Sequence, residues 1–283
     1  MRVLVIDGNN LVHRVYWIAK NQTRREKYFH VYLFLACVKS YIQAYSPQKV
    51  FCVWDEKQEK NINPRYILYP GYKQNRNTEH AKEVHKYNFL IYGLLKSLGI
   101  QNVYPHCYEA DDVISIICNK INTDDNEFRV ITADKDLCQL ICKNIEIYDP
   151  IKKDLYTHTN FKEKLKYSIN DFLFTKAVLG DKSDNIEGVK GIGIKKLQKV
   201  LLKEIQLTQE QESIVFRNLA ILDLKNVLTC DTEVQHVLRQ INSVTQINKS
   251  VFKEICSLCR FTHILEKFDI WLEEFIIYKN DTN

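Results

Sequence analysis

Three acidic residues crowd into a four-residue stretch of the chain, at Glu109, Asp111 and Asp112. The apolar residues that follow, such as Ile114 and Ile117, recur with helical spacing, so the acids lie at or just before a helix N-terminus. A helix N-terminus favours negative charge, and taken alone the stretch fits an N-cap with acidic neighbours. Three carboxylates this close nevertheless repel one another unless a cation neutralises them, and a hard divalent cation does so best. The stretch therefore has two interpretations, a helix cap or part of a metal site.

Similar acids recur where predicted strands end. Continuous apolar runs near residues 3–6, 49–54 and 128–132 are typical of strands buried on both faces of a parallel sheet. Each run is followed within two residues by an aspartate, namely Asp7, Asp55 and Asp134. Each acid alone is more often a cap or turn residue, but three strand ends of this kind are hard to explain by capping. Ligands bind beyond the carboxyl ends of such strands, so these acids are expected to converge on one edge of the sheet.

Three further acids are placed to reach the same cleft. Asp136 lies one turn beyond Asp134, and Asp181 and Asp184 have helical spacing across a loop. So many carboxylates make little sense as one general acid–base pair. They fit ligands of two Mg²⁺ ions about 3.5–4 Å apart, the arrangement of phosphodiester-cleaving sites.

The elements that must position these acids follow a β-α alternation up to about residue 158, which predicts an α/β class with a mainly parallel sheet. Single helices are expected over about 81–98 and 136–142, and the pattern after residue 158 is all helical. Residues 56–76 are polar and without hydrophobic periodicity, so this segment is expected to become ordered on DNA. A net charge of +5 permits a nucleic-acid partner without proving one.

Composition also limits the setting of the protein. Nine cysteines scattered through predicted helices and strands, with no secretory signal at the N-terminus, indicate free thiols in a reducing compartment. No apolar run approaches membrane-spanning length. We therefore expect a cytoplasmic protein, in the host cytoplasm if a phage encodes it, and no membrane partner.

Two stretches suggest nucleic-acid contacts. The glycine-rich turn Gly188-Val189-Lys190-Gly191-Ile192-Gly193 precedes Lys195 and Lys196. Such a turn in isolation is usually a tight connection between helices, but with these lysines it resembles a helix-hairpin-helix whose N–H groups bind a phosphate. Lys73 and Arg76 stand beside Tyr72, and basic residues with an aromatic neighbour are the composition of a single-strand grip.

These motifs occur in an order that resembles a known family. The stretches Val-Ile-Asp-Gly-Asn-Asn (5–10), Val-Trp-Asp (53–55), Tyr-Lys-Gln-Asn-Arg (72–76), Glu-Ala-Asp-Asp (109–112), Thr-Ala-Asp-Lys-Asp (132–136) and Gly-Asp-Lys-Ser-Asp-Asn-Ile…Gly-Val-Lys-Gly-Ile-Gly (180–193) are similar to those of the structure-specific 5′-nucleases. That family comprises the flap endonucleases, including the compact bacteriophage type, and the 5′→3′ exonuclease domain of bacterial DNA polymerase I. The resemblance covers about residues 3 to 200.

The resemblance implies a PIN-like sheet with two metal sites. Mg²⁺ would be the metal, with Mn²⁺ able to substitute. The first site would consist of Asp7, Asp55, Glu109, Asp111, Asp112 and Asp134, and the second of Asp136, Asp181 and Asp184, with some sharing. Asp112 and Asp134 would be catalytic, together with Lys73, which would stabilise charge on the scissile phosphate.

The same resemblance implies how DNA is held. Tyr72 would stack near the scissile phosphate, Arg76 would hold the single strand, and Arg14 would guide the 5′ strand. Gly188, Val189, Gly191, Gly193, Lys195 and Lys196 would grip duplex DNA, with a monovalent cation such as K⁺ bridging to the phosphate. The expected domains are a catalytic domain at 1–158, with an arch region at about 56–98, and a helical region at 159–283, with the helix-hairpin-helix at about 186–202.

The sequence thus predicts a hydrolase, a Mg²⁺-dependent flap endonuclease and 5′→3′ exonuclease acting on branched or 5′-ended DNA in replication or repair. RNA–DNA primers are a further expected substrate class. The protein is expected to be a monomer, and a replication polymerase is a partner that the sequence permits but does not identify. Two alternatives stay open at this point. A PIN-like binding scaffold without catalysis would need broken acid positions, and an RNA-directed PIN ribonuclease would lack the turn at 188–193.

Overall fold

The computed structural model of the chain describes residues 1–22, 27–56, 62–75 and 78–280. At its centre is a six-stranded sheet with the order β3-β2-β1-β4-β5-β6, in which β6 alone runs antiparallel to its neighbour. The strands are β1 (Arg2–Asp7), β2 (Lys49–Val53), β3 (Gln101–Val103), β4 (Glu127–Ile131), β5 (Ile145–Asp149) and β6 (Asp154–Tyr156). The predicted α/β class with a mainly parallel sheet is therefore confirmed.

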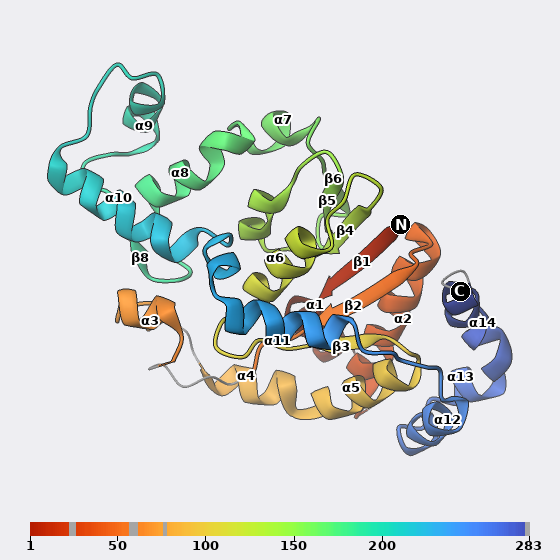
Figure 1. Cartoon of the computed structure of the whole chain (residues 1–283). Helices are drawn as coiled ribbons and strands as arrows, with labels where there is room; N and C mark the ends of the chain where they lie inside the picture. The colour runs from red at the N-terminus through yellow and green to blue at the C-terminus, as the bar shows by residue number, and fades with distance from the viewer. Residues whose placement is uncertain (23–26, 57–61, 76–77, 281–283) are drawn as a thin grey trace.

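Helices cover both faces of the sheet (Figure 1). The helices of the first half are α1 (Gly8–Lys20), α2 (Phe29–Tyr45), α3 (Pro64–Leu68), α4 (Thr78–Val84), α5 (Asn88–Ser97) and α6 (Ala110–Lys120). Those of the second half are α7 (Phe161–Leu165), α8 (Ile169–Leu179), α9 (Ile194–Leu201), α10 (Gln209–Leu222), α11 (Asp231–Ile241), α12 (Lys249–Leu258), α13 (Thr262–Glu266) and α14 (Phe268–Asn280). Short 3-10 helices are η1 (His85–Tyr87), η2 (Lys135–Leu140) and η3 (Asn226–Thr229), and a small antiparallel ribbon pairs β7 (Gly180–Asp181) with β8 (Ile186–Glu187).

The central strand β1 is buried on both of its faces, as its unbroken apolar run predicts. Leu4 and Ile6 point into one hydrophobic core, which α1, α2 and α5 cover. Val3 and Val5 point into a second core on the opposite face, beneath α6 and α11. Strand alternation thus divides a single sequence run between two cores.

Two predicted helices differ in the structure. The helix expected over 81–98 is two helices, α4 and α5, separated by the tight turn η1, where the Tyr87 ring packs against Tyr28 and His30. The helix expected over 136–142 is the 3-10 helix η2, because Asp134 caps the N–H of Asp136 and Cys142 pairs with Ile145 in a β-bridge. The first correction arises from tertiary contacts and the second from local capping and bridging, and hydrophobic periodicity reports neither.

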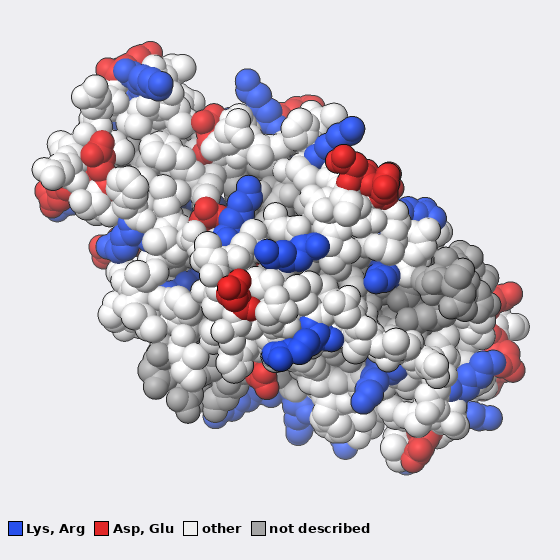
Figure 2. Space-filling model, viewed as in Figure 1, with Lys and Arg blue, Asp and Glu red and all other residues white. Residues whose placement is uncertain are grey.

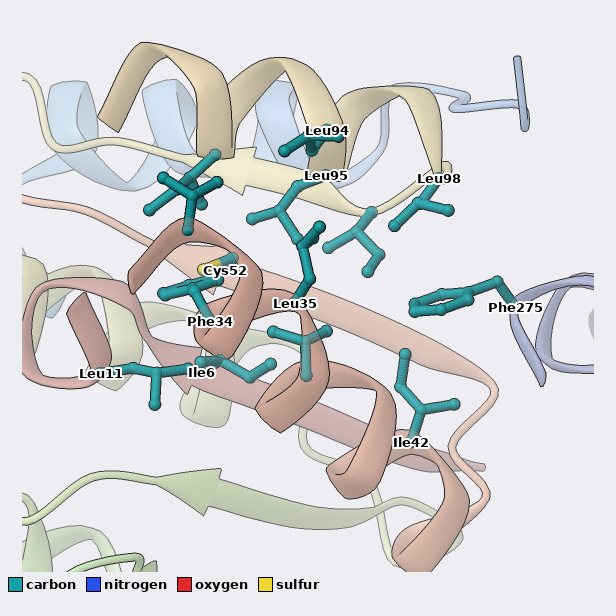
Figure 3. Packing of buried hydrophobic residues seen from close by; sticks show 14 of the residues in the cluster. Ile6, Leu11, Phe34, Leu35, Ile42, Cys52, Leu94, Leu95, Leu98 and Phe275 are labelled. Carbon is teal, nitrogen blue, oxygen red and sulfur yellow. The ribbon is translucent and has the colours of Figure 1, made fainter. Parts of the chain in front are cut away.

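The last helices of the chain return to the first core. Phe252 of α12 and Leu272 and Phe275 of α14 belong to the same buried cluster as Phe34 of α2. In Figure 3 the Phe275 ring approaches from α14 toward Leu98 and Ile42. The residues after about 203, for which the sequence offers no motif, therefore complete the core of the sheet domain. The domain boundary predicted at residue 158 stays a prediction.

A third hydrophobic cluster ties the predicted arch to the helical region. It contains Tyr72 together with Val178 of α8, Leu197 of α9 and Val215 of α10. Residues 62–75 are therefore not the orderless segment that their polarity suggests, since α3 and Tyr72 pack against these helices. Figure 1 shows α9 at the tip of this region, beyond α8 and α10.

Acidic and basic side chains are interspersed over the face seen in Figure 2. In the part of the chain that the structure describes, no helix combines the length and the apolar character needed to cross a bilayer.

Candidate functional site

The strand ends bring their acids to one edge of the sheet, as predicted. Asp7 ends β1 and caps α1, and its carboxylate accepts hydrogen bonds from the Asn10 N–H at 3.0 Å and from Thr132 Oγ1 at 2.8 Å. Asp55 follows β2 and accepts a hydrogen bond from the backbone N–H of Ala110 at 2.7 Å. The ends of β1, β2 and β4 and the start of α6 are therefore joined through carboxylates.

The triple-acid stretch is a helix cap, and its spacing also leaves it a candidate metal site. Glu109 is the N-cap of α6 and forms a capping box with Asp112. The carboxylates of Glu109, Asp111 and Asp112 also have oxygens within 4.8 Å of one another, close enough to share one metal ion. Capping therefore accounts for two of the acids, and it leaves the charge of the whole group to be balanced.

A buried arginine balances part of this charge. Arg65 of α3 forms a bidentate pair with Asp112, at 2.5 and 2.7 Å, and its Nη1 also donates to Glu109 Oε2 at 2.8 Å. Its Nε donates to the carbonyl of Ile221 in α10 at 2.8 Å, so the guanidinium is held from two sides. Buried charges are stable only when paired in this way.

The arginine gives Asp112 a partner within the protein. Both Asp112 oxygens are bonded to Arg65, and only 2% of its side chain is exposed, against 14% for Glu109 and 25% for Asp111. In this conformation Asp112 anchors Arg65, and its predicted role as a metal ligand stays a prediction. Glu109 and Asp111 are the more exposed members of this stretch.

Lys73 lies against the same group of acids. Its Nζ donates to Glu109 Oε1 at 2.6 Å and lies 3.9 Å from Asp184 Oδ2. Burial acts to raise the pKa of Glu109, but the charges of Lys73 and Arg65 outweigh it and lower the pKa to about 2. Lys73 is therefore at the acid edge, where the sequence predicted it.

Tyr72 does not offer a face for stacking. Only 2% of the residue is exposed, and its ring belongs to the third hydrophobic cluster. Its hydroxyl donates to Glu109 Oε2 at 2.8 Å. The predicted stacking role is wrong for this conformation, because the packing of α3 turns the ring inward.

The second group of acids surrounds Lys176 of α8. The Lys176 ammonium pairs with Asp136 and, at 2.9 Å, with Asp181 Oδ2. Burial acts to raise the pKa of Asp181, but hydrogen bonds from Ser183 and Lys176 lower it to about 2. Burial raises the pKa of Asp134, and the charges of Lys176 and Asp184 also act on it. Asp134 is therefore near enough to both groups to interact with them electrostatically.

The donor set fits divalent metal ions. Burial raises the pKa of Asp7 to about 7, and the neighbouring carboxylates Asp134 and Asp55 add to the rise. Carboxylates that repel one another in a shared cleft are the ligands that hard cations with oxygen preference select. A divalent ion at this edge would relieve that repulsion. Asp7, Asp55 and Asp134, which influence one another electrostatically, are candidate ligands beside the closely spaced Glu109, Asp111 and Asp112.

The glycine-rich turn divides into an inward and an outward part. A Cβ on Gly188 would lie 2.3 Å from the Leu179 carbonyl oxygen, and the Val189 N–H donates to Val178 at 2.7 Å. These two residues pack the turn against α8 and do not offer their backbone to a ligand. Gly191 and Gly193 have nothing within 4 Å of their Cβ positions, and Lys195 and Lys196 are exposed beside them. The outward part begins α9 and is the part that can approach a phosphate.

The structure leaves two of the predicted DNA-binding residues untested. Arg14 lies on α1 and donates from Nη1 to the Tyr41 hydroxyl at 3.1 Å, and its role in guiding a strand stays a prediction. Arg76 lies outside the described residues.

Two cations that pair with these acids, Arg65 and Lys176, are not predicted by the sequence. The sequence predicts a cation beside the three acids but indicates only a metal ion for that place. An arginine directly after Pro64, inside a segment read as polar loop, was the available signal. Lys176 lies on a predicted helix five residues before Asp181, where lysines are usually solvated.

Comparison with known proteins identifies the family. Residues 2–166 match the model of the 5′-3′ exonuclease, N-terminal resolvase-like domain. A 5′-3′ exonuclease of Mycoplasmopsis pulmonis is 29% identical over 98% of this chain and 92% of the relative. Flap endonuclease Xni of Shewanella denitrificans is 31% identical over 71% of this chain and 77% of the relative. A solved structure of the T5 5′-exonuclease with bound zinc ions superposes with a TM-score of 0.66 at 19% identity, over 86% of this chain and all of that one.

The fold and the acidic edge define a nuclease of the resolvase-like, PIN-like type, whose relatives are metal-binding enzymes. The chain belongs to the 5′-3′ exonuclease family, which the ordered motifs predicted. It is a structure-specific 5′-nuclease, and the predicted hydrolase class is confirmed.

Proposed function

We propose that the protein hydrolyses phosphodiesters near the 5′ ends of branched DNA, such as flaps and primer ends, with two Mg²⁺ ions as cofactors. The observation that carries this proposal is the convergence of two carboxylate groups, one at the strand ends and one at the β7–β8 ribbon, with Lys73 between them. Sites of this type cleave phosphodiesters by an in-line displacement.

Each acid group would hold one ion. Asp7, Asp55, Glu109, Asp111 and Asp134 would hold the first, and Asp136, Asp181 and Asp184 the second, with Asp134 shared. When bound, the ions supply an activated water and stabilisation of the leaving oxygen. Mn²⁺ has the same ligand preference and should substitute.

The two lysines would have different tasks when substrate arrives. Lys73 Nζ lies 2.6 Å from Glu109, so its charge is available at the edge of the first group to stabilise charge on the scissile phosphate. Lys176 bridges Asp136 and Asp181, the acids of the second group, and would have to leave them when an ion binds. In the proposed reaction, the scissile phosphate would bind beside Lys73, and a metal ion would replace the Lys176 ammonium.

Duplex DNA would bind at Gly191 to Lys196, where the backbone is open and α9 begins. A K⁺ ion bridging to the phosphate would add to this grip. Gly193→Ala tests the contact cleanly: Gly193 has a φ of −100° and its Cβ position is open, so the free protein should be unaffected. Duplex affinity should fall by about threefold to tenfold, since the methyl group blocks the backbone's approach to phosphate. Unchanged affinity would show that the turn only connects helices.

The central experiment is cleavage of a labelled 5′-flap duplex, read at nucleotide resolution with and without Mg²⁺. We expect cuts near the base of the flap that require the metal. A matched substrate with an RNA 5′ segment measures the acceptance of primers, and a single-stranded RNA tests the RNA-directed alternative. Cleavage of that RNA in preference to the flap would overturn the proposal.

A threading test addresses the segment near Lys73. A bulky folded adduct on the 5′ end of the flap should slow cleavage, whereas the same adduct on the 3′ end should not. Equal cleavage rates for the two blocked substrates would contradict the prediction that the 5′ strand threads through an arch. We further propose a monomeric, cytoplasmic protein that works beside a replication polymerase.

A further inference from the structure

The loop that carries the second acid group also holds the backbone around Lys73. The Asn185 Nδ2 donates to the carbonyl of Gly71 at 2.7 Å, and the N–H of Lys73 donates to the carbonyl of Asp184 at 2.9 Å. Asn75 Nδ2 adds a hydrogen bond to the Lys182 carbonyl at 2.8 Å. Residues 71–75 and 182–185 are therefore joined at three points, although more than a hundred positions separate them.

Lys73 needs such support because of its own backbone. Its φ of +54° lies in the left-handed region, which a residue with a Cβ adopts only when its surroundings impose it. The residues that impose it here are those of the facing loop. Asn185 itself has a φ of +58°, a conformation that asparagine tolerates better than most residues.

The facing loop is in turn fixed to the helical region. Asn218 of α10 is fully buried, and its Nδ2 donates to the carbonyls of Ala177 and Glu187 at 2.7 and 2.8 Å. Arg217 donates to the Glu187 carbonyl and lies over the Tyr69 ring at 4.7 Å. The chain from β7 through the glycine-rich turn is thus packed to α8 and α10 on one side and to residues 69–75 on the other.

We infer that Asn185 is a positioning residue for the reaction: it sets Lys73 at the acid edge by fixing the backbone at Gly71. The inference rests on the function proposed above for Lys73. If the inference is correct, Lys73 and the glycine-rich turn proposed to face duplex DNA belong to one packed unit. A duplex bound at Gly191 to Lys196 would then have a fixed position relative to Lys73. The loop at 182–185 would therefore help to determine which phosphodiester is cut.

Two substitutions remove the hydrogen bond in different ways. Asn185→Gly keeps the positive φ without strain and deletes the donor. Asn185→Asp keeps the shape and replaces the donor with an acceptor that repels the Gly71 carbonyl. The matched controls are Asn160→Gly and Asn160→Asp, because Asn160 Nδ2 also donates to a backbone carbonyl, that of Leu155 at 2.9 Å. Asn160 follows the end of β6, and β6 is antiparallel to β5, so this end of the strand lies at the edge of the sheet opposite the acids.

The experiment is a double-mutant cycle of wild type, Lys73→Ala, Asn185→Gly and the double variant. Single-turnover cleavage of the 5′-flap duplex is measured with Mg²⁺, and duplex affinity is measured in chelator. Asn185→Gly should slow cleavage by about tenfold and change duplex affinity by less than about twofold. In the Lys73→Ala background the same substitution should change the rate by less than about twofold, because the group that it positions is gone.

The outcomes separate the inference from the function beneath it. If Lys73→Ala slows cleavage but Asn185→Gly and Asn185→Asp do not, the positioning role is wrong and the proposed function stands. Rate effects that multiply in the double variant would also overturn it, since Asn185 would then act independently of Lys73. If Lys73→Ala leaves the rate unchanged, the role proposed for Lys73 fails and the inference fails with it. Equal losses in the Asn160 controls would show a general effect of losing one such hydrogen bond.

Discussion

The two acid groups each contain carboxylates that repel one another, and different cations reduce this repulsion in the two groups. Acids Glu109 and Asp112 of the first group are paired with Arg65, whose side chain is 7% exposed and is held by α10 as well. Acids Asp136 and Asp181 of the second group are paired with Lys176, which is 20% exposed and sits on a flexible four-carbon stem. The guanidinium is bonded to the α10 backbone as well as to acids, whereas the ammonium is paired with acids at a more exposed position.

This difference separates a permanent counter-ion from a displaceable one. Arg65 pairs with Glu109 and Asp112 and lies 3.6 Å from Asp111, so it neutralises part of the charge of three carboxylates without a metal. Under the proposed function, a cation that binds the second group would compete with Lys176 for Asp136 and Asp181. We therefore expect the first group to depend on its arginine for folding and the second to depend on its lysine for metal selectivity.

The largest expected effect concerns Asp134, which interacts electrostatically with both groups. Asp134→Asn should lower the single-turnover cleavage rate by about 10³-fold or more, because a shared ligand supplies several kcal/mol of transition-state stabilisation. Asp136→Asn should have a smaller effect, since it alters the second group alone. Thermal unfolding serves as the control for folding. Near-normal turnover in Asp134→Asn would show that Asp134 is not a metal ligand. Equal losses of cleavage rate in the two variants would show that Asp134 is no more important than an acid of the second group.

The comparison predicts a difference in stability between the two cations. Arg65→Met leaves Asp112 buried without a partner and should lower the free energy of unfolding by about 3–5 kcal/mol. Lys176→Met should lower it by a smaller amount, because Asp136 and Asp181 keep 20% and 13% of their side chains exposed whereas Asp112 keeps only 2%. Urea unfolding in chelator measures both. Similar values for the two variants would mean that Arg65 is no more structural than Lys176.

Asp7 gives the first group a pH dependence. Its pKa is about 7 in the metal-free protein, above its ordinary value near 4, so the folded state keeps the proton that the unfolded chain loses between these pH values. The contribution of Asp7 to stability is therefore present below about pH 4, falls as pH rises, and is lost above about pH 7. Asp7→Asn removes this penalty and should stabilise the metal-free protein at pH 8 by about 1–3 kcal/mol, but not at pH 4.

Thermal unfolding of both proteins at the two pH values measures this effect, with the exposed Asp124→Asn as control. Saturating Mg²⁺ should reverse the order at pH 8, since a metal that binds the folded wild type stabilises it by mass action. A stabilisation of Asp7→Asn that is the same at both pH values would contradict the electrostatic explanation.

The smallest expected effect concerns the affinity for divalent metal ions and tests whether Lys176 competes with them. Lys176→Met should tighten divalent-metal binding by about threefold to tenfold, because the ammonium no longer competes for Asp136 and Asp181. Titration calorimetry with Mn²⁺ in the absence of DNA measures it. Lys162→Met, which removes an exposed lysine from α7, controls for the change in net charge. Weaker binding in Lys176→Met would show that the lysine organises the acids and does not compete with the ion.

The sequence was a good guide wherever one local pattern led to one structural outcome. The apolar runs predicted β1, β2 and β4, and the aspartates after them had to meet because the ends of neighbouring parallel strands share an edge. The glycine-rich turn was located correctly, but its residues were treated as alike. Only packing shows that Gly188 meets the Leu179 carbonyl while Gly191 and Gly193 face open space.

The pairing of charges belongs to the tertiary structure. Arg65 reaches Glu109 across 44 positions and Asp112 across 47, and its other partner, the Ile221 carbonyl, is 156 positions away. Nothing in the spacing of these residues encodes the contacts, because α3 is brought to the acids by the packing of Tyr72 and its neighbours against α8 and α10. The sequence by itself determined that carboxylates would gather at the carboxyl edge of a parallel sheet, since strand direction alone requires it. Which cation neutralises each carboxylate, and therefore which acids remain available to metal, was decided by helices far apart in the chain that pack together.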